Sequence, residues 1–205
     1  MTGGFDVILA DPPWFYNQRR ASGSKFGGGA CFHYPLMRDD EILALPVRDV
    51  AAENAALFLW ATFPRLPFAL RVVEAWGFEY KTAGFCWAKT NPDGSPFFGV
   101  GYYTKSNAEV CLLGTRGRPL RPAVDDVSSM VISPRREHSR KPEAVTRRIE
   151  RMYPNSRKLE MFSREPRPGW VTWGNQAEHG GDLLEVLSVP TATGAEAQQR
   201  QQYLF

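Results

Sequence analysis

The sequence predicts an α/β protein built on a mostly parallel sheet with helices on both faces. Short apolar runs of strand length alternate along the chain with amphipathic segments long enough for helices. The apolar runs are nearly continuous, which is typical of strands that are buried on both faces. With 205 residues, of which 43% are hydrophobic and 23% charged, the chain has the composition of one ordinary globular domain with a sizeable core.

Strands are expected at residues 5–10, 57–60, 80–88, 109–114, 128–132, 158–162 and 170–173. Helices are expected at residues 39–45, 65–75 and 141–153. Asp39 is placed to cap the first helix and Ser139 the last, while Gly77 follows the second as a C-terminal glycine. Pro142 suits the first turn of the last helix, which has one apolar stripe.

Two loops and the C-terminal segment stand apart from this alternation. Residues 15–34 are basic and rich in Gly and Ser, and we expect a mobile lid there. Residues 91–107 mix Gly and Pro with aromatic residues and Lys105, which suits either stacking on bases or packing against a neighbouring surface. Residues 181–205 are expected to form a flexible tail, with an alternative docking helix at 198–205.

Asp11-Pro12-Pro13-Trp14, at the tip of the first strand, is the most informative motif. The carboxylate and the Pro12 carbonyl can accept hydrogen bonds from an exocyclic amine, and Trp14 can offer a stacking face. Each proline fixes its own φ and restricts the residue before it, so the acceptors are oriented before a ligand binds. The alternative is a structural Pro-Pro turn with Trp14 in the core.

Several classes of protein are excluded by what the sequence lacks. It has no G-x-G-x-x-G opening a helix, no P-loop and no G-x-S-x-G nucleophile. No apolar run is long enough to span a membrane, and the N-terminus does not resemble a signal peptide. We therefore expect a reduced, cytoplasmic protein with no metal and no membrane contact. The widely spaced cysteines and histidines, which form no zinc pattern, are Cys31, Cys86, Cys111, His33, His138 and His179.

The net charge is only +3, but the basic residues are unevenly distributed. Clusters of this kind suit a polyanion such as nucleic acid. Solvated helix faces with glutamate partners would explain part of the same pattern. The main cluster consists of Arg135, Arg136, Arg140, Lys141, Arg147, Arg148, Arg151, Arg157, Lys158, Arg164 and Arg167.

The segment from Val7 to Trp14 resembles the catalytic motif of the MT-A seventy family, the Asp-Pro-Pro-Trp adenine methyltransferases. This family includes the catalytic subunit of the eukaryotic messenger-RNA adenosine methyltransferase and many bacterial and phage DNA adenine methyltransferases. The resemblance runs from about residue 5 to residue 176. Further matching blocks are His33-Tyr34 with Met37, residues 58–60, 76–78, 87–91, Glu109 with 111–114, 139–142, 150–151, 157–162 with Arg164, and 170–176.

The resemblance implies a seven-stranded Rossmann-like methyltransferase that uses S-adenosylmethionine, with the catalytic motif ahead of the cofactor-binding half. Residues 1–180 would form the catalytic domain. By the same resemblance, Asp11 and the Pro12 carbonyl hold the adenine 6-amino group, and Trp14 and Tyr34 bound the base. Pro13 belongs to the same catalytic motif.

The remaining site residues are also implied by the resemblance. Lys141 would lie near the methionine part of the cofactor and the substrate, with Glu109 close by, and Asp11 would border the cofactor too. Arg164, Asn175 and Gln176 would bind the cofactor ribose.

The expected function is methylation of the adenine 6-amino group in DNA. The alternatives are an RNA adenosine methyltransferase and a catalytically weak nucleic-acid-binding subunit, and a second copy or a methyltransferase-like partner is left open. Two departures from the family leave the cofactor's adenine pocket unplaced. Only about five residues precede the first strand, and the stretch between Arg164 and Trp170 lacks a His-Asn pair found in some relatives, which leaves the Pro166-Arg167 region or the tail as candidates.

Overall fold

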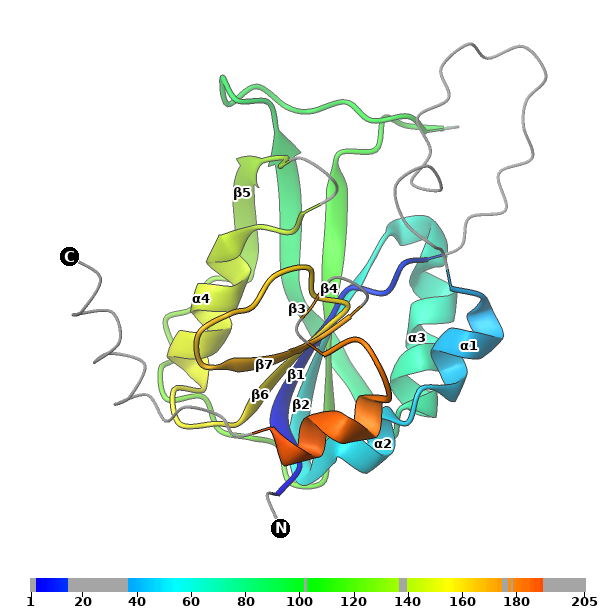
Figure 1. Cartoon of the computed structure of the whole chain (residues 1–205). Helices are drawn as coiled ribbons and strands as arrows, with labels where there is room; N and C mark the ends of the chain where they lie inside the picture. Colours follow the sequence, from blue (N-terminus) through cyan, green and yellow to red (C-terminus); the bar gives the residue numbers. More distant parts are fainter. Residues whose placement is uncertain are drawn as a thin grey trace.

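The structure is a computed structural model that describes residues 3–14, 37–101, 103–136, 140–174, 177 and 179–189. Within these residues, one seven-stranded sheet crosses the molecule in the order β5-β3-β4-β2-β1-β6-β7 (Figure 1). The seven expected strands are confirmed, although β2 begins at Ala51 rather than Leu57. The strands are β1 (Phe5–Ala10), β2 (Ala51–Ala61), β3 (Glu79–Thr90), β4 (Ala108–Arg116), β5 (Met130–Pro134), β6 (Lys158–Met161) and β7 (Trp170–Trp173).

The order of the strands reverses at β1, which lies between β2 and β6 and is parallel to both. From β1 the chain builds one half of the sheet through β2 to β5, and it returns later to build β6 and β7 on the other side. Only β4 runs antiparallel to its neighbours, β2 and β3. The carboxyl ends of β1 and β6 therefore form a switch point, where α/β sheets bind ligands.

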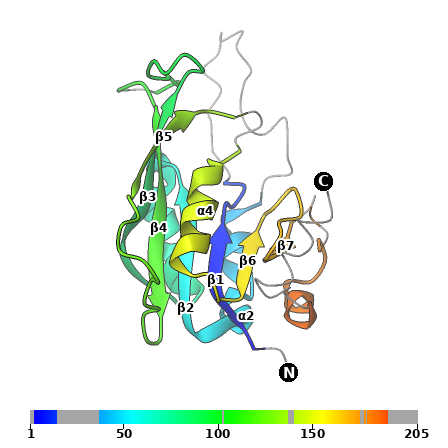
Figure 2. The same cartoon turned by 90° about the vertical axis from the view of Figure 1, so that its left-hand side faces the viewer.

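Helices cover both faces, as the sequence predicts. On one face, α1 (Asp39–Ala44), α2 (Val47–Val50) and α3 (Leu66–Ala75) pack onto a core that includes Ile8, Leu57 and Leu159. On the other face, α4 (Glu143–Met152) buries Val145 and Ile149. Figure 2 looks onto the side of the sheet that carries α4. The short η2 (Phe63–Arg65) precedes α3.

The predicted caps of two helices are not the observed ones. Arg38 is the N-cap of α1, and its backbone N–H donates to Glu41 at 2.7 Å. Asp39 lies in the first turn instead, and its carboxylate pairs with Arg65. The last helix begins at Glu143, and its N-cap is Pro142, which has an extended backbone. Ser139, the expected cap, lies outside the described residues.

The chain just after Gly180 is packed, contrary to the expected loose tail. The 3₁₀ helix η4 (Leu183–Ser188) buries Leu183 and Val186, and it contacts α2. The Arg157 guanidinium donates to the carbonyls of Val186, Leu187 and Val189 at 3.2, 3.1 and 2.9 Å. Residues 181–189 therefore extend the core of the domain. The expected lid, the docking helix and the rest of the tail lie outside the described residues.

We predict that Val186→Ala lowers the free energy of unfolding by about 1–3 kcal/mol, because it leaves a cavity where a fully buried side chain packed. Leu184→Ala on the same helix is the control, since Leu184 is 41% exposed, and it should change stability by less than about 0.5 kcal/mol. Urea unfolding measures both. Equal effects of the two substitutions would contradict the packing of η4.

Candidate active site

Asp11 directly follows β1 and stands at the switch point. Its Oδ2 accepts a hydrogen bond from Lys141 Nζ at 2.7 Å. Lys141 precedes α4, so this ion pair joins the end of the central strand to the segment that leads into the helix on one face. The side chain of Asp11 is 33% exposed and that of Lys141 is 17% exposed, so the pair is only partly open to solvent.

The ion pair is one end of a longer row of charges. Lys141 Nζ also lies 3.4 Å from Glu109 Oε2, and the other carboxylate oxygen of Glu109 accepts from Lys89 at 2.5 Å. We call Asp11, Lys141, Glu109 and Lys89 the charge row. Glu109 comes from β4 and Lys89 from β3, so the row crosses the sheet. The sequence places Glu109 and Lys141 together through the family resemblance, and the structure confirms this contact.

Two buried indoles cover the charge row. Lys141 Nζ lies 5.7 Å from the centroid of the Trp60 ring, and Lys89 Nζ lies 5.0 Å from that of Trp87. The two tryptophan rings meet edge to face, with centroids 6.4 Å apart. Each ammonium group therefore has a carboxylate and an aromatic face as partners, which compensates for its partial removal from water.

The surroundings change the acidity of the row in different directions. Burial raises the pKa of Asp11 above its ordinary value and outweighs the opposing charge of Lys141. Burial also acts to raise the pKa of Glu109, but the charges of Lys141 and Lys89 hold that pKa below its usual range. Burial alone would lower the pKa of Lys141, yet the carboxylates of Asp11 and Glu109 raise it. Lys141 is therefore cationic at neutral pH.

The thiol of Cys111, which lies near Asp11, is shielded from solvent. Cys111 of β4 is completely buried, and burial raises the pKa of its thiol well above the ordinary value, with the charge of Asp11 adding to the shift. A thiol in this environment stays protonated at neutral pH, whereas the thiolate is the reactive form.

The Asp-Pro-Pro-Trp segment forms a tight turn. The Trp14 N–H donates to the Pro12 carbonyl at 2.8 Å, and the Met37 N–H donates to the Pro13 carbonyl at 3.4 Å. The sequence suggested that the Pro12 carbonyl is free to accept a hydrogen bond from a ligand, but it already accepts one from Trp14. A carbonyl oxygen has two lone pairs, so it can still accept a second donor. The turn directs Asp11 towards Lys141.

Trp14 lies in the core, so the expectation that its face stacks on a base is wrong for this structure. Trp14 is only 5% exposed, and its Nε1–H donates to the Trp60 carbonyl at 3.2 Å. Its ring meets Phe68 of α3 edge to face at 5.9 Å. Trp14 therefore fixes the position of the turn by packing against a helix that follows much later in the chain.

Arg65 supports the same turn and was not singled out by the sequence. Its guanidinium lies 4.5 Å from the Phe68 ring centroid and 5.9 Å from that of Trp14. It also forms an ion pair with Asp39, which ties α1 to the start of α3. Its buried Nε has no hydrogen-bond partner among the described residues. No local pattern identifies such a residue, because its partners come from three separate segments.

A cleft of about 360 Å³ opens beside Asp11 at the switch point. It is lined by the ends of β1 and β6, by residues 140–146 and by residues 162–168. Arg164, an expected site residue, lines the cleft, and its charge acts to lower the pKa of Asp11. Tyr34, Asn175 and Gln176 lie outside the described residues.

The backbone at the end of β6 is unusual for a non-glycine residue. Phe162 has a φ of +63°, a conformation that costs free energy and is often found at functional sites. Its ring packs on Trp173 with centroids 5.4 Å apart, which holds it in place. Gly174 follows β7, and a Cβ there would come within 2.6 Å of the Ser163 carbonyl oxygen. A side chain at Gly174 would therefore collide with the segment 163–168, which lines the cleft.

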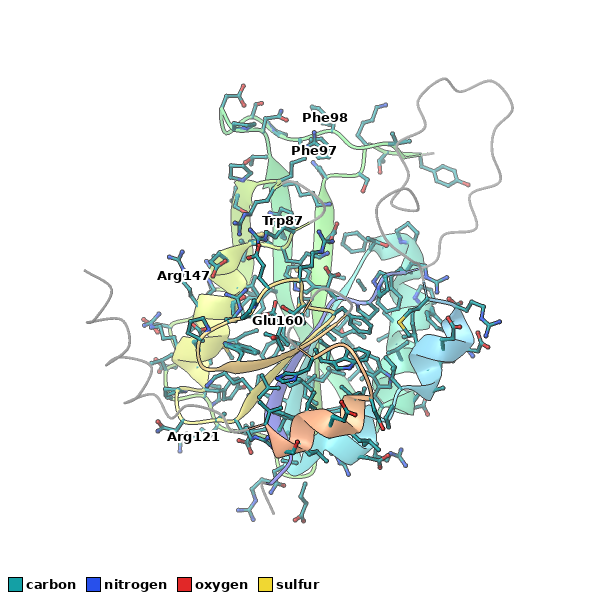
Figure 3. The ribbon with its side chains drawn as sticks, in the orientation of Figure 1. Trp87, Phe97, Phe98, Arg121, Arg147 and Glu160 are labelled. Atoms are coloured by element: carbon teal, nitrogen blue, oxygen red, sulfur yellow. The ribbon has the colours of Figure 1, made fainter. Side chains whose placement is uncertain are left out.

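A second set of ion pairs forms one wall of the cleft. Arg167 Nε donates to Glu160 Oε2 at 2.7 Å, and its guanidinium also lies 2.7 Å from Glu143 Oε1. Arg140 pairs with Glu165 across the same region. Figure 3 labels Glu160 near the end of β6. These acidic residues were not predicted as site residues, because isolated glutamates carry no distinguishing pattern in the sequence.

Many residues of the basic cluster make contacts within the protein. Arg148 caps backbone carbonyls, Arg151 pairs with Asp126, and Lys158 is buried against two carbonyls. Much of the cluster therefore stabilises the fold. Arg135 and Arg136 are exposed. In the part of the chain that the structure describes, no group of three or more His, Cys, Asp or Glu could hold a metal ion, and no helix has the length and apolarity to cross a membrane.

Comparisons with known proteins bear on this site. The model of the MT-A70 family matches residues 5–176. The type II methyltransferase M.MunI of a Mycoplasma species is 34% identical over 186 residues, which cover 83% of this chain and 76% of M.MunI. Human METTL3, an N(6)-adenosine-methyltransferase catalytic subunit, is 30% identical over 193 residues, or 89% of this chain. An MT-A70-like N(6)-adenosine-methyltransferase of Arabidopsis thaliana is 30% identical over 183 residues, or 85% of this chain. The matches span only 30% and 24% of the human and plant proteins.

We predict that Trp14→Ala lowers the free energy of unfolding by about 3–5 kcal/mol, because a buried aromatic side chain is lost. Phe63→Ala is a matched control, since Phe63 is 54% exposed and lies just before α3. Chemical denaturation followed by circular dichroism gives both values. A Trp14 variant as stable as the control would show that the indole is not part of the core.

Proposed function

Because the chain belongs to the MT-A70 family, we propose that it is an S-adenosylmethionine-dependent methyltransferase that modifies the 6-amino group of adenine in DNA. The observation that carries the proposal is Asp11, held by Lys141 at the switch point beside a cleft of about 360 Å³. The choice of DNA rests on M.MunI, which shares more identity with this chain than METTL3 does and is matched over most of its length.

Asp11 and Pro12 supply the two acceptors that the reaction needs. Lys141 donates to Oδ2 of Asp11, and the carboxylate has further lone pairs for other donors. Oδ1 and the second lone pair of the Pro12 carbonyl can therefore accept the two hydrogens of the amine. The amine of adenine is a poor nucleophile because its lone pair is delocalised into the ring. Two acceptors favour a pyramidal nitrogen, whose lone pair is then available for reaction.

The cleft has the charges that suit the cofactor. S-adenosylmethionine has a carboxylate, an ammonium group and ribose hydroxyls, and the cleft offers Arg164 and Lys141 together with Asp11 and Glu160. When bound, the cofactor supplies a methyl group on a positively charged sulfur. Lys141 holds Asp11 in its orientation, and the prolines and Trp14 keep the turn rigid, so little reorganisation is needed.

The rest of the proposed site follows the family resemblance. Arg164 would bind the ribose together with Asn175 and Gln176, and Tyr34 would lie against the adenine ring. Arg167 lines the cleft together with its partners Glu160 and Glu143. It belongs to the region that the sequence offered as a candidate for the cofactor's adenine pocket.

Transfer to adenosine in RNA is the second candidate function. The similarity to METTL3 and to the Arabidopsis protein, both named as N(6)-adenosine-methyltransferases, favours it. The deciding experiment incubates the protein with methyl-labelled S-adenosylmethionine and DNA or RNA oligomers of the same sequence. We expect label in DNA as 6-methyladenine. Preferential labelling of RNA would select the second candidate, and absence of both transfer and cofactor binding would reject the enzyme.

We predict that Asp11→Ala reduces methyl transfer by about 100-fold or more, because one of the two acceptors is lost, while cofactor binding remains measurable. Asp126→Asn is the control, since this exposed carboxylate pairs with Arg151 on the surface, and it should retain full activity. Calorimetry with the cofactor and a labelled-transfer assay give the two readouts. Full activity of the Asp11 variant would show that the motif is structural.

The acid side of the pH–rate profile should depend on Lys141. Transfer requires ionised Asp11, so activity should be lost as the pH falls through the pKa of Asp11. Because burial raises this pKa, the loss should begin at a higher pH than the ordinary aspartate pKa of about 3.9 would give. The charge of Lys141 acts to lower this pKa, so Lys141→Met should move the acid limb to higher pH. Lys81→Met, which removes a surface charge paired with Glu79, is the control. A limb that stays in place or moves to lower pH contradicts the ion pair.

A further inference from the structure

A loop beyond the carboxyl end of β3 carries aromatic side chains that the protein leaves uncovered. Phe98 is 66% exposed and Tyr103 is completely exposed. Phe97 is partly buried, and the Arg135 guanidinium lies 4.5 Å from the centroid of its ring. Figure 3 shows Phe97 and Phe98 on this loop, beyond Trp87 of β3. We call residues 96–101 and 103–106 the aromatic loop.

The aromatic loop is anchored to the charge row. The Phe97 N–H donates to the Lys89 carbonyl at 3.0 Å, and the Arg135 N–H donates to the carbonyl of Thr90 at 3.2 Å. The side chain of Lys89 is the last member of the row. The base of the loop is further closed by a hydrogen bond of 2.8 Å from the Gly99 N–H to the Ser106 carbonyl. The loop therefore has a fixed start next to the site.

The charge row determines how far the aromatic loop lies from Asp11. In space, Lys141, Glu109 and Lys89 lie one after another between Asp11 and the start of the loop. A base held at Asp11 is consequently separated from Phe98 by the whole row. Nucleotides next to the target that continue past Lys89 would therefore meet the exposed aromatic side chains of the loop.

The charge of this surface fits a polyanion. Arg135 and Lys105 are exposed here, whereas Asp93 is the one acidic residue in the described part of the loop region 91–107. Exposed aromatic rings next to cations are the combination that binds single-stranded nucleic acid, since bases stack on the rings and phosphates contact the cations.

A protein partner is less well supported by the neighbouring edge strand. Ile132 and Met130 on β5 are exposed, and β5 is the last strand of the sheet. However, Arg148 donates to the carbonyls of Ser128 and Met130 at 2.8 and 2.7 Å. These contacts occupy carbonyls at this edge, and an added strand would have to displace them.

We propose that Phe98 and Tyr103 stack on bases that flank the target adenine, and that Arg135, oriented by Phe97, contacts a phosphate of the same strand. This inference rests on the proposed function. It assigns the recognition of an unpaired segment around the target to the aromatic loop, and it resolves the two interpretations that the sequence left open for residues 91–107 in favour of stacking.

The test uses a fluorescently labelled single-stranded DNA oligomer with one adenine and 2-aminopurine beside it. Phe98→Ala and Tyr103→Ala should each weaken binding by about 5- to 100-fold in fluorescence anisotropy, without a change in the salt dependence. They should also reduce the quenching of 2-aminopurine, which reports stacking directly. Arg135→Ala should lower the slope of log K against log salt by about one.

Tyr80→Ala is the matched control, because Tyr80 is 45% exposed at the opposite end of β3 and should bind as the wild type does. Unchanged affinity and quenching in both loop variants overturn the inference, even where the wild-type protein transfers methyl groups and the proposed function stands. A change of oligomeric state in sedimentation with unchanged DNA binding also overturns it, in favour of a protein interface. If the wild type transfers no methyl group but the variants lose binding, the surface stands and the proposed function fails.

Discussion

The ion pair between Asp11 and Lys141 is the contact on which the candidate site depends. It lies at the switch point, where the order of the strands reverses, and it joins the end of β1 to the segment that precedes α4. The two halves of the sheet are built by parts of the chain that are far apart in sequence. At the switch point, the pair holds the Asp-Pro-Pro-Trp segment, which follows β1, next to the cleft beside β6.

A partly buried ion pair is weak evidence for stability, because the loss of hydration offsets much of the attraction between the charges. Its value here is orientation. Lys141 has Glu109 as a second carboxylate partner and Trp60 as an aromatic one, so its ammonium group is held from several directions. Lys141 bonds to Oδ2 of Asp11, so in the proposed site Oδ1 would accept from the amine of the substrate. The same row ends at Lys89, whose carbonyl accepts a hydrogen bond from the Phe97 N–H of the aromatic loop.

The sequence was sufficient to predict the sheet, the position of the motif and the meeting of Lys141 with Glu109. The strand β1 is apolar except for Asp6, and this signal is local. The position of Trp14 could not be predicted, because its partners are Phe68 and the Trp60 carbonyl, which only the folded chain brings to it. An exposed stacking face and a buried anchor look alike in sequence.

Ion pairs between distant segments were the other feature beyond prediction. Arg65 meets Asp39 and Trp14, and Arg167 meets Glu143, through packing that no spacing rule encodes. The packed segment after Gly180 was missed for a related reason. Residues 183–189 are rich in Leu and Val, but this run is short, and the burial of Leu183 and Val186 depends on contact with the core.

A double-mutant cycle of Asp11→Asn and Lys141→Met on the rate of methyl transfer tests the central claim most directly. Residues that act as one unit are strongly non-additive, so the double variant should be about as slow as the slower single variant. The cofactor and the nucleic acid are kept saturating, so that the rate reports the chemical site. A double variant whose loss equals the product of the two single losses would show that Asp11 and Lys141 act independently, and it would contradict the account.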